Sequence, residues 1–483
     1  MIGRACLAAI ALLVPAAGGA PDEVRTERFD RDPGWDGRNN RSETPGPRTV
    51  RQDFGWSATS NAGGEAGEVG GWVSPDAAPA FYAKVLPPAG FDDPLSASGV
   101  LVVGADGRPD GNTLVGFFNA DTLNEWRTPR SIVLRVNGRG EEGFHLHLEY
   151  ATSRWRAGGD FFAATDARTG KRSPRMIRGG RAAYRWSLAY DPAGNAGGGT
   201  VAATLDGETL VLPLDPGHKA DGASFNRFGI LNVMKSVDSG GALWLDDVTL
   251  NGRKEAFARD PGWEGRDNRK TYESRDVRPR FDFGFSATRH AGGAAAGELG
   301  GLVFRGDERY PDRMAFYGDR LEPLTLEKPL RASGRVCLAR GVTDSTVLLG
   351  FFHSTGSMRA SRAQVSGVPE NFLGIAIEGP SREGFLFYPL YGTDREGEAA
   401  AADYRRAPPI LPDATSHEWT LAYSPEGAGR IAVSLDGKAV SLDLSSAHRA
   451  IGASFDRFGI VTTHIDGNGQ RVYFDDLTYT CKQ

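Results

Sequence analysis

The chain contains an internal duplication, and no other feature limits its possible folds as much. Residues 29–41 (FDRDPGWDGRNNR) return as residues 257–269 (FARDPGWEGRDNR), and residues 222–230 (GASFNRFGI) return as residues 452–460 (GASFDRFGI). Shorter matches between these, such as residues 67–71 (GEVGG) and 297–301 (GELGG), keep nearly the same spacing. The length of 483 residues would otherwise suggest about three domains. The repeat predicts two homologous units, 26–252 and 253–483, with no linker between them and therefore packed together.

Apolar residues recur with a period of two within each unit, which indicates β-strands. Phe144, Leu146, Leu148 and Tyr150 alternate with polar residues, a pattern typical of an antiparallel sheet with one packed face. Asp206-Gly207 and Asp436-Gly437 sit between alternating runs, as tight hairpin turns do. With 64 Gly and no long helical stripe, the sequence predicts an all-β chain of two tandem homologous antiparallel β-sandwich (jelly-roll) domains.

Charge and the N-terminal residues indicate the compartment and exclude one class of partner. The 56 basic and 61 acidic residues give a net charge of −5, which argues against a nucleic-acid partner. Arg4, a short apolar run and small residues up to Ala20 predict a signal peptide at 1–20, and no stretch is long enough for a membrane span. We therefore expect a secreted, periplasmic or cell-surface protein. Cys337 and Cys481 remain after cleavage, and whether they pair is open.

Each unit begins with the Pro-Gly-Trp turn and ends with an aromatic-x-Asp-Asp strand, at residues 244–247 and 473–476. This pattern resembles the concanavalin A-like lectin/glucanase superfamily, including laminin G-like and carbohydrate-binding modules. The resemblance implies extracellular binding of a polysaccharide or oligosaccharide, no organic cofactor, and a structural calcium ion held by a terminal Asp. The duplicated pattern is also similar to uncharacterised exported bacterial proteins, which adds no chemistry. The oligomeric state is left open.

The most distinctive polar pattern is His145-x-His147-x-Glu149, in the first unit. Period two places these three side chains on one face of a strand, an arrangement that suits a metal site or a strip that binds sugar hydroxyls. Trp126, Arg154 and Trp155 are candidates for stacking and hydrogen bonding beside it. The alternative is a solvated sheet face without function. The second unit has Leu386, Tyr388 and Leu390 at the aligned positions, and we expect these three to dock against the first unit.

Acidic residues near the ends of the units are candidate calcium ligands, since calcium takes oxygen ligands. They are Asp246 and Asp475, with Asp30 expected to join Asp246 in the first unit. The counterpart of Asp30 is Ala258, so a site in the second unit is doubtful.

Other repeated residues are predicted to serve the fold. We expect Trp35 and Trp263 to fill the core and Glu68 and Glu298 to be buried hydrogen-bonding anchors, with a stacking platform and a site acid as the respective alternatives.

The leading hypothesis is an exported, non-catalytic glycan-binding protein. No Glu-x-Asp-x-x-Glu arrangement of glucanase type is present. A glycoside hydrolase or polysaccharide lyase, with its site in the first repeat or between the repeats, is the alternative. A structural or adhesive surface protein is the third hypothesis. Convergent carboxylates or a His/Tyr/Arg cluster in a deep cleft would favour an enzyme, and a shallow aromatic groove would favour binding.

Overall fold

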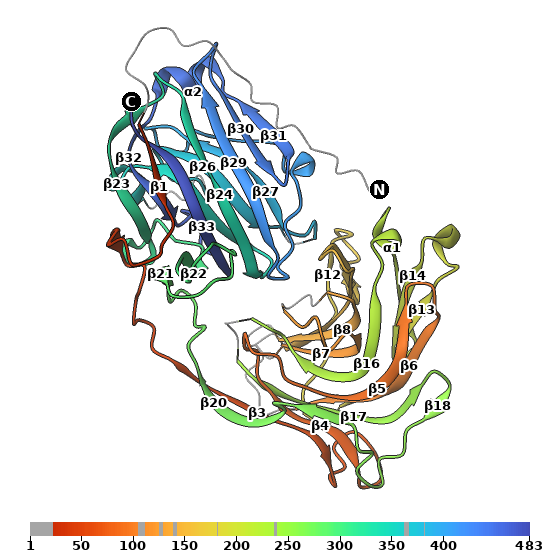
Figure 1. Ribbon diagram of the computed structural model, residues 1–483. Coiled ribbons are helices and arrows are strands. Elements are labelled where there is room, and N and C mark those ends of the chain that lie inside the picture. Colours follow the sequence, from red (N-terminus) through yellow and green to blue (C-terminus); the bar gives the residue numbers. More distant parts are fainter. Residues whose placement is uncertain are drawn as a thin grey trace, which may run out of the picture.

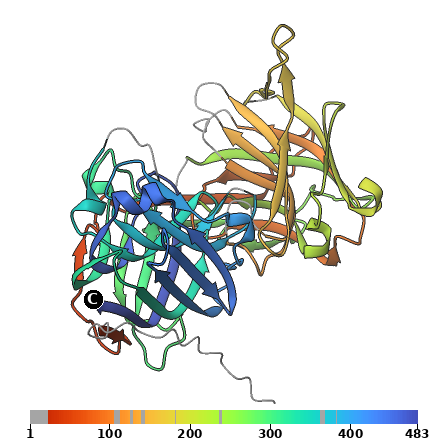
Figure 2. The ribbon, with the colours of Figure 1, turned by 90° about the horizontal axis from the view of Figure 1, so that it is seen from above.

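The computed structural model describes residues 23–104, 112–124, 129–138, 143–180, 182–235, 239–361, 367–380 and 382–483. The predicted signal peptide and Trp126 lie outside the described residues. Two β-sandwiches stand side by side, one built mainly from the first half of the chain and the other mainly from the second half (Figures 1 and 2). None of the helices in the described ranges is long and apolar enough to cross a membrane.

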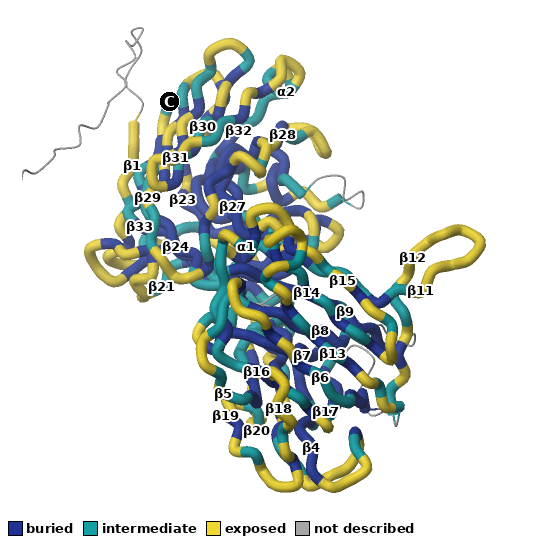
Figure 3. The backbone as a smooth tube through the Cα atoms, turned by 90° about the vertical axis from the view of Figure 1, so that its right-hand side faces the viewer, coloured by how far each residue is buried: buried dark blue, intermediate teal, exposed yellow. Residues whose placement is uncertain are grey.

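The first sandwich packs two antiparallel sheets, 1A and 1B, around one core. Sheet 1A has the order β15 (Glu208–Pro213), β14 (Thr200–Leu205), β13 (Ala183–Asp191), β6 (Leu95–Val103), β17 (Gly241–Leu250), β4 (Glu68–Val73), β3 (Arg48–Ser57), β20 (Arg269–Ser274), with β18 (Arg253–Lys254) beside β17. Sheet 1B has the order β10 (Ala157–Phe161), β9 (Phe144–Ala151), β8 (Ser131–Gly138), β7 (Asn112–Phe118), β16 (Ser224–Asn232), β5 (Phe81–Gly90), β19 (Glu264–Arg266). A small hairpin, β11 (Ala163–Thr165) with β12 (Arg172–Pro174), projects from this sandwich (Figure 3).

The second sandwich repeats this strand order. Sheet 2A has the order β21 (Asp282–Ser286), β22 (Glu298–Phe304), β33 (Gly469–Lys482), β24 (Leu330–Arg340), β29 (Ser416–Ser424), β30 (Arg430–Leu435), β31 (Lys438–Asp443), with β1 (Glu23–Glu27) beside β33. Sheet 2B has the order β2 (Asp36–Arg38), β23 (Phe316–Thr325), β32 (Ser454–Val461), β25 (Ser345–Phe352), β26 (Phe372–Gly379), β27 (Leu386–Gly392), β28 (Ala399–Ala401). Strands that match in the sequence repeat therefore occupy matching positions in the two sandwiches.

Helices are short and lie in the connections between strands. They are η2 (Asn195–Gly197), α1 (His218–Asp221), η3 (Pro311–Arg313), η4 (Gly356–Met358), η5 (Tyr404–Arg406) and α2 (Ser446–Ile451).

The alternating pattern of the sequence accounts for the strands and their faces. Phe144, Leu146, Leu148 and Tyr150 of β9 lie in the core of the first sandwich, as predicted. The two predicted hairpin turns are also confirmed, because Asp206 and Gly207 (φ 48° and 87°) join β14 to β15, and Asp436 and Gly437 join β30 to β31. Positive φ at both positions matches the right-handed twist of the strands.

Sandwich membership does not follow the boundaries of the sequence repeats. The segment that opens the first repeat, residues 23–41, pairs through β1 with β33 and through β2 with β23, both in the second sandwich (Figure 1). The segment that opens the second repeat, residues 253–274, pairs through β18, β19 and β20 with strands of the first sandwich. We name these the N-terminal and the internal closing segment. The predicted units 26–252 and 253–483 are corrected to 48–274 for the first sandwich and 23–41 with 282–483 for the second.

The two tryptophans of the closing segments fill the sandwiches on which the segments lie. Trp263 is 8% exposed in the core of the first sandwich, and its ring stacks on Tyr82 at 5.9 Å between centroids. Trp35 packs against the core of the second sandwich, with its ring 5.9 Å from that of Tyr317. The prediction that both tryptophans belong to the core is confirmed for Trp263, whereas Trp35 is partly buried and packs against the core from outside.

This arrangement predicts that each tryptophan stabilises the sandwich made by the other half of the sequence. We expect Trp35→Ala to reduce the free energy of unfolding of the second sandwich by about 3 kcal/mol, as loss of a large core side chain does. Limited proteolysis with mapping of the cuts should show them within 282–483. The matched variant Trp263→Ala should move the cuts to 48–274. Cuts within 48–274 in the Trp35→Ala variant would contradict the assignment of Trp35 to the second sandwich.

Candidate functional site

A cavity of about 540 Å³ lies where the two sandwiches meet. The first sandwich contributes the turn between β9 and β10 together with α1, and the second contributes the turn before β27 together with η5. The lining residues are Arg154, Arg156, Ala157, Asp215, His218, Asp221, Arg382, Glu383, Phe385, Leu386, Tyr404, Arg405 and Pro409. This volume is in the range of sites for small ligands, about 300–1,000 Å³.

The turn between β9 and β10 presents arginines to the cavity on both sides of a buried tryptophan. The Thr152 N–H donates to the Arg156 carbonyl at 2.8 Å, and Trp155 has a φ of 60°, which turns the chain sharply. Arg154 is exposed, whereas the Arg156 Nε donates to Asp221 at 2.6 Å. Arg154, predicted as a binding residue, therefore lines the cavity with its charge free of an ion pair among the described residues.

Trp155 has a different role from the predicted one. Its side chain is 7% exposed and belongs to the core cluster of the second sandwich. The Ala157 N–H next to it donates to the Arg382 carbonyl at 3.0 Å, and the Arg382 guanidinium donates to the Gly159 carbonyl at 2.7 Å. Gly384 has a φ of 89°, which favours glycine, and it lies close enough to the first sandwich that a Cβ there would be 3.1 Å from the Arg154 carbonyl oxygen. Trp155 holds the sandwiches together and presents no face to a sugar.

The residues expected to dock the second unit do so only in part. Leu386, Tyr388 and Leu390 are buried, but they pack in a cluster made of second-sandwich residues, with Tyr404 of η5 against it. Leu386 alone lines the cavity. The prediction that all three pack on the first unit is wrong, because the chain following β28 folds back over this face.

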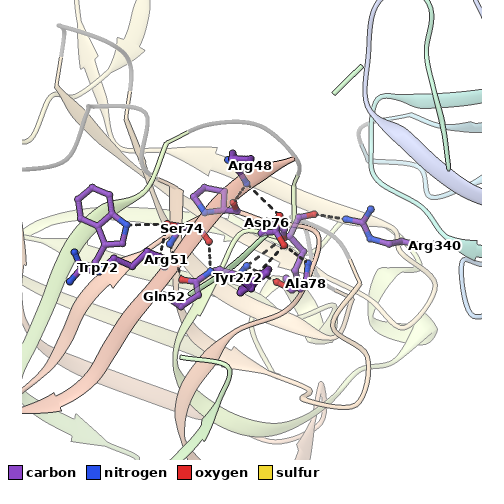
Figure 4. A network of polar contacts seen from close by, with 12 residues as sticks. Arg48, Arg51, Gln52, Trp72, Ser74, Asp76, Ala78, Tyr272 and Arg340 are labelled. Carbon is purple, nitrogen blue, oxygen red and sulfur yellow. Dashed lines mark hydrogen bonds and ion pairs between the residues drawn. The ribbon is translucent and has the colours of Figure 1, made fainter. Parts of the chain in front are cut away.

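A second contact between the sandwiches lies beside a polar network of the first (Figure 4). Arg340, at the end of β24, donates to the Met234 carbonyl at 3.0 Å. In the network, Asp76 accepts from the Tyr272 hydroxyl at 2.9 Å and from Arg48 at 3.4 Å. Tyr272 belongs to the internal closing segment, so this network ties that segment to β3.

The cavity also contains a histidine whose neighbour is a buried tyrosine. His218 Nδ1 is 3.0 Å from the Tyr150 hydroxyl, which accepts from the Asp215 N–H at 2.8 Å. Burial and then the charge of Arg156 lower the pKa of His218, and burial raises the pKa of Tyr150 to about 12. Both groups are therefore neutral near pH 7. The second sandwich has an equivalent pair in Tyr391 and His448, with ring centroids 6.5 Å apart, so the pair belongs to the fold.

His145, His147 and Glu149 share one face of β9, as predicted, and this face is opposite the core. His145 and Glu149 are only 2% and 4% exposed, and His147 is partly exposed. Glu149 forms an ion pair with Arg135 of β8 at 2.9 Å. The expected solvated alternative does not describe this strip. A ligand-binding role for it stays a prediction.

The candidate calcium ligands are not assembled as expected. Asp30 lies in the N-terminal closing segment on the second sandwich, whereas Asp246 is in β17 of the first, so the predicted pairing of these two is wrong. Asp475 of β33 is the counterpart of Asp246. In both, one carboxylate oxygen accepts the N–H of the next residue at 2.7 Å. Within the described ranges, no group of three or more His, Cys, Asp or Glu is placed to hold a metal. Calcium binding at Asp246 or Asp475 stays a prediction.

Glu68 and Glu298 are buried anchors, as predicted. Glu298 is fully buried and accepts from the Thr288 hydroxyl and from the N–H groups of His290 and Ala291 at 2.5–2.9 Å. Glu68 holds the corresponding loop of the first sandwich through Thr59, Asn61 and Ala62. Cys337 and Cys481 are both buried and free.

A cluster of titratable groups in the second sandwich was not identified from the sequence. His464 Nδ1 is 3.1 Å from Glu308 and 4.0 Å from Glu370, and all three side chains are at most 5% exposed. Burial would lower the pKa of His464, but the hydrogen bonds to Glu308 and to the Ser357 carbonyl outweigh it and raise that pKa. Burial raises the pKa of Glu370. All three side chains are buried, and they join the connections after β22, before β26 and after β32.

The contacts of Trp155 predict that it maintains the cavity. We expect Trp155→Ala to lower the free energy of unfolding by about 3 kcal/mol. Small-angle scattering should then show a larger radius of gyration, because the sandwiches lose the apolar part of their contact. An unchanged radius and stability would contradict this role. Trp72→Ala is the control, since Trp72 is a partly buried tryptophan of β4 in the first sandwich.

The burial of Asp475 leads us to expect that the stability of the second sandwich depends on pH. Its side chain is 1% exposed, and burial raises its pKa to about 6 from an ordinary 3.8. The folded state therefore binds this proton more tightly, and the associated stability is lost as pH rises through about 6. We expect Asp475→Asn to raise the free energy of unfolding by about 2 kcal/mol at pH 8 and to change it little at pH 4. Denaturation at both pH values measures this, with exposed Asp312→Asn as control. An equal effect at both pH values would refute it.

No protein-family model and no curated protein matches the chain. Solved structures similar to it include domains LG4–5 of the mouse laminin alpha1 chain, with 13% identity over 96% of this chain and 92% of that chain at a TM-score of 0.24. The carbohydrate recognition domain of Emp47p has 9% identity over 44% and 92% of the two chains (TM-score 0.26). Alginate lyase Aly36B, solved with an alginate tetrasaccharide, has 11% identity over 38% and 80% (TM-score 0.24). These are concanavalin A-like jelly-roll sandwiches, the fold group that the sequence resembles, and the likeness concerns the fold alone.

Proposed function

We propose that the chain binds an anionic oligosaccharide in the cavity between its sandwiches, without catalysing a reaction on it. One observation carries the proposal. Arg154 from the first sandwich and Arg382 and Arg405 from the second line one cavity, and among the described residues none of the three is in an ion pair with a carboxylate.

Guanidinium groups suit carboxylate- or sulfate-bearing sugars for a physical reason. Arginine presents a planar fork of donors that matches these anions, and it is more weakly hydrated than an ammonium group. The Arg405 guanidinium lies over the Tyr404 ring at 5.4 Å, which orients it at the cavity wall. Asp215 and Glu383 in the same wall are acceptors for sugar hydroxyls.

The expected compartment agrees with this ligand class. The signal peptide predicted for residues 1–20 supports a location outside the cytoplasm, where polysaccharides are found, and the resemblance of the sequence implies glycan recognition. A binding site between two sandwiches needs both of them in place, which the closing segments and Trp155 provide.

The second candidate function is a polysaccharide lyase, favoured by the His218–Tyr150 pair next to the arginines. Removal of a proton from a sugar ring needs a base and an acid in contact with that ring. Tyr150 is 1% exposed and its hydroxyl is engaged by Asp215 and His218, so it does not reach the cavity. The occurrence of the pair in both sandwiches also favours a structural role. Formation of unsaturated products from a polyuronate, lost in His218→Ala, would establish the lyase instead.

Binding is tested with uronic-acid, sulfated and neutral oligosaccharides of equal length. We expect Arg154→Ala and Arg405→Ala each to weaken binding of the anionic sugars about 10-fold, since a hydrogen bond to a charged group contributes roughly 1.5–3 kcal/mol. Affinity should fall as salt is raised. The control is Arg168→Ala, an exposed arginine outside the cavity. Equal affinity for neutral and anionic sugars, or an equal loss in the control, would refute the proposal.

A further inference from the structure

We propose that the N-terminal closing segment is exchangeable between copies of the chain. The partner is a second copy, and reciprocal exchange of residues 23–41 joins two chains into a strand-swapped dimer. The inference rests on the closing segments and is independent of the glycan cavity.

The two closing segments make equivalent apolar contacts. Each sandwich therefore has the same kind of binding site for this motif. Phe257 and Trp263 pack edge to face at 5.5 Å in the core of the first sandwich. Phe29 and Trp35 do the same at 5.2 Å in the second. The glycine beneath each phenylalanine, Gly67 or Gly297, lies so close to the phenylalanine carbonyl that a Cβ would be 1.8–1.9 Å from that oxygen.

The polar contacts are equivalent as well. Arg457 forms an ion pair with Asp36 at 2.8 Å, and Arg227 forms one with Glu264 at 2.7 Å. Asn40 donates to the Phe283 carbonyl at 2.6 Å. Asn268 donates to the Phe54 carbonyl at 2.5 Å in the same way. One motif is thus recognised by the same set of contacts in both sandwiches.

The connections of the two segments differ, and this decides which one can exchange. The internal segment follows β17 directly and continues through residues 275–281 into the second sandwich. Within the described residues, the N-terminal segment joins a sandwich through the connection that ends at Arg48, where β3 begins. Its last contacts with the second sandwich are made by Ser42, which exchanges hydrogen bonds with Phe281 at 3.0–3.1 Å. Residues 43–47 are therefore the hinge about which residues 23–41 can leave their own chain.

Among the described residues, the strand pairings, the Asn40 hydrogen bond and the Asp36 ion pair of the segment are made with the second sandwich, so a segment from another copy would make the same contacts. Whether a sandwich binds the segment of its own chain or that of another copy then depends on the protein concentration, because the segment of the same chain has a high effective concentration at its binding site. Exchange of an identical element is a low-cost route to a dimer. We therefore expect monomer from dilute refolding and swapped dimer when chains refold together at high concentration.

The pairing of β1 with β33 allows a direct test. Thr26 and Thr478 lie opposite each other, with hydroxyl oxygens 3.0 Å apart. Thr26→Cys and Thr478→Cys are placed in separate chains that begin at residue 21 and carry Cys481→Ser, because Cys481 lies on the same strand. The two variants are unfolded together, refolded at high concentration, and oxidised.

A covalent heterodimer joined through positions 26 and 478 is the expected result, and size-exclusion chromatography should show dimer increasing with refolding concentration. The two variants refolded separately and then mixed should give several-fold less. Asp92→Cys, whose native side chain is 95% exposed on the first sandwich, replaces Thr26→Cys as the control for random disulfides. Only monomer at every refolding concentration, or as much heterodimer with the Asp92→Cys control, would overturn the proposal.

Discussion

Phe29 and Trp35 pack on the second sandwich although they open the first repeat, and this contact determines how the chain is divided between the two sandwiches. Because residues 23–41 lie on one sandwich and β3 begins the other, the chain crosses between the sandwiches at 42–47 and crosses back at 275–281. These two crossings hold the sandwiches next to each other. Trp155, which packs in the core of the second sandwich, and the hydrogen bond from Arg340 to the Met234 carbonyl fix their contact. Arg154 and Arg405 come from different sandwiches, so the cavity that they line exists only while these contacts hold.

The two sandwiches have equivalent cores and differ in what covers them. On β9 the face away from the core carries His145, His147 and Glu149, whereas the equivalent face of β27 carries apolar residues that form a second small core. Met234 of the first sandwich is replaced at the matching position by His464, which joins Glu308 and Glu370. The fold therefore constrains the residues of the inner sheet faces and leaves those of the outer faces and loops free to differ. A function present in one sandwich and not the other can arise at these outer positions.

The sequence predicted much of the fold because its signals are local or repeated. Period-two alternation placed Leu146 and Leu148 in the core, and each Asp-Gly pair set a hairpin. The repeated Pro-Gly-Trp motif correctly indicated a tryptophan that packs on a core. It could not indicate which sandwich that would be, since both sandwiches make the same contacts with the motif. The assumed pairing of Asp30 with Asp246 failed for the same reason.

The site was less predictable, because it depends on how the sandwiches meet. Trp155 between two arginines suggested a sugar platform, and only its φ of 60° and the neighbouring core show that it is a buried contact. Arg154 was identified, but Arg382 and Arg405 lie more than 200 residues away in sequence and carry no motif. Glu308, Glu370 and His464 likewise come from three separate loops, without the spacing that marks a site.

Hydrogen–deuterium exchange, compared between a chain that begins at residue 21 and one that begins at residue 48, tests the reciprocal closure most directly. Loss of residues 23–41 removes the partner of the end of β33 and of the edge of β23. The account predicts faster exchange in β33, β23 and β32 of the second sandwich and unchanged protection in β4, β16 and β17 of the first. Faster exchange confined to the first sandwich, or no change in either, would contradict it.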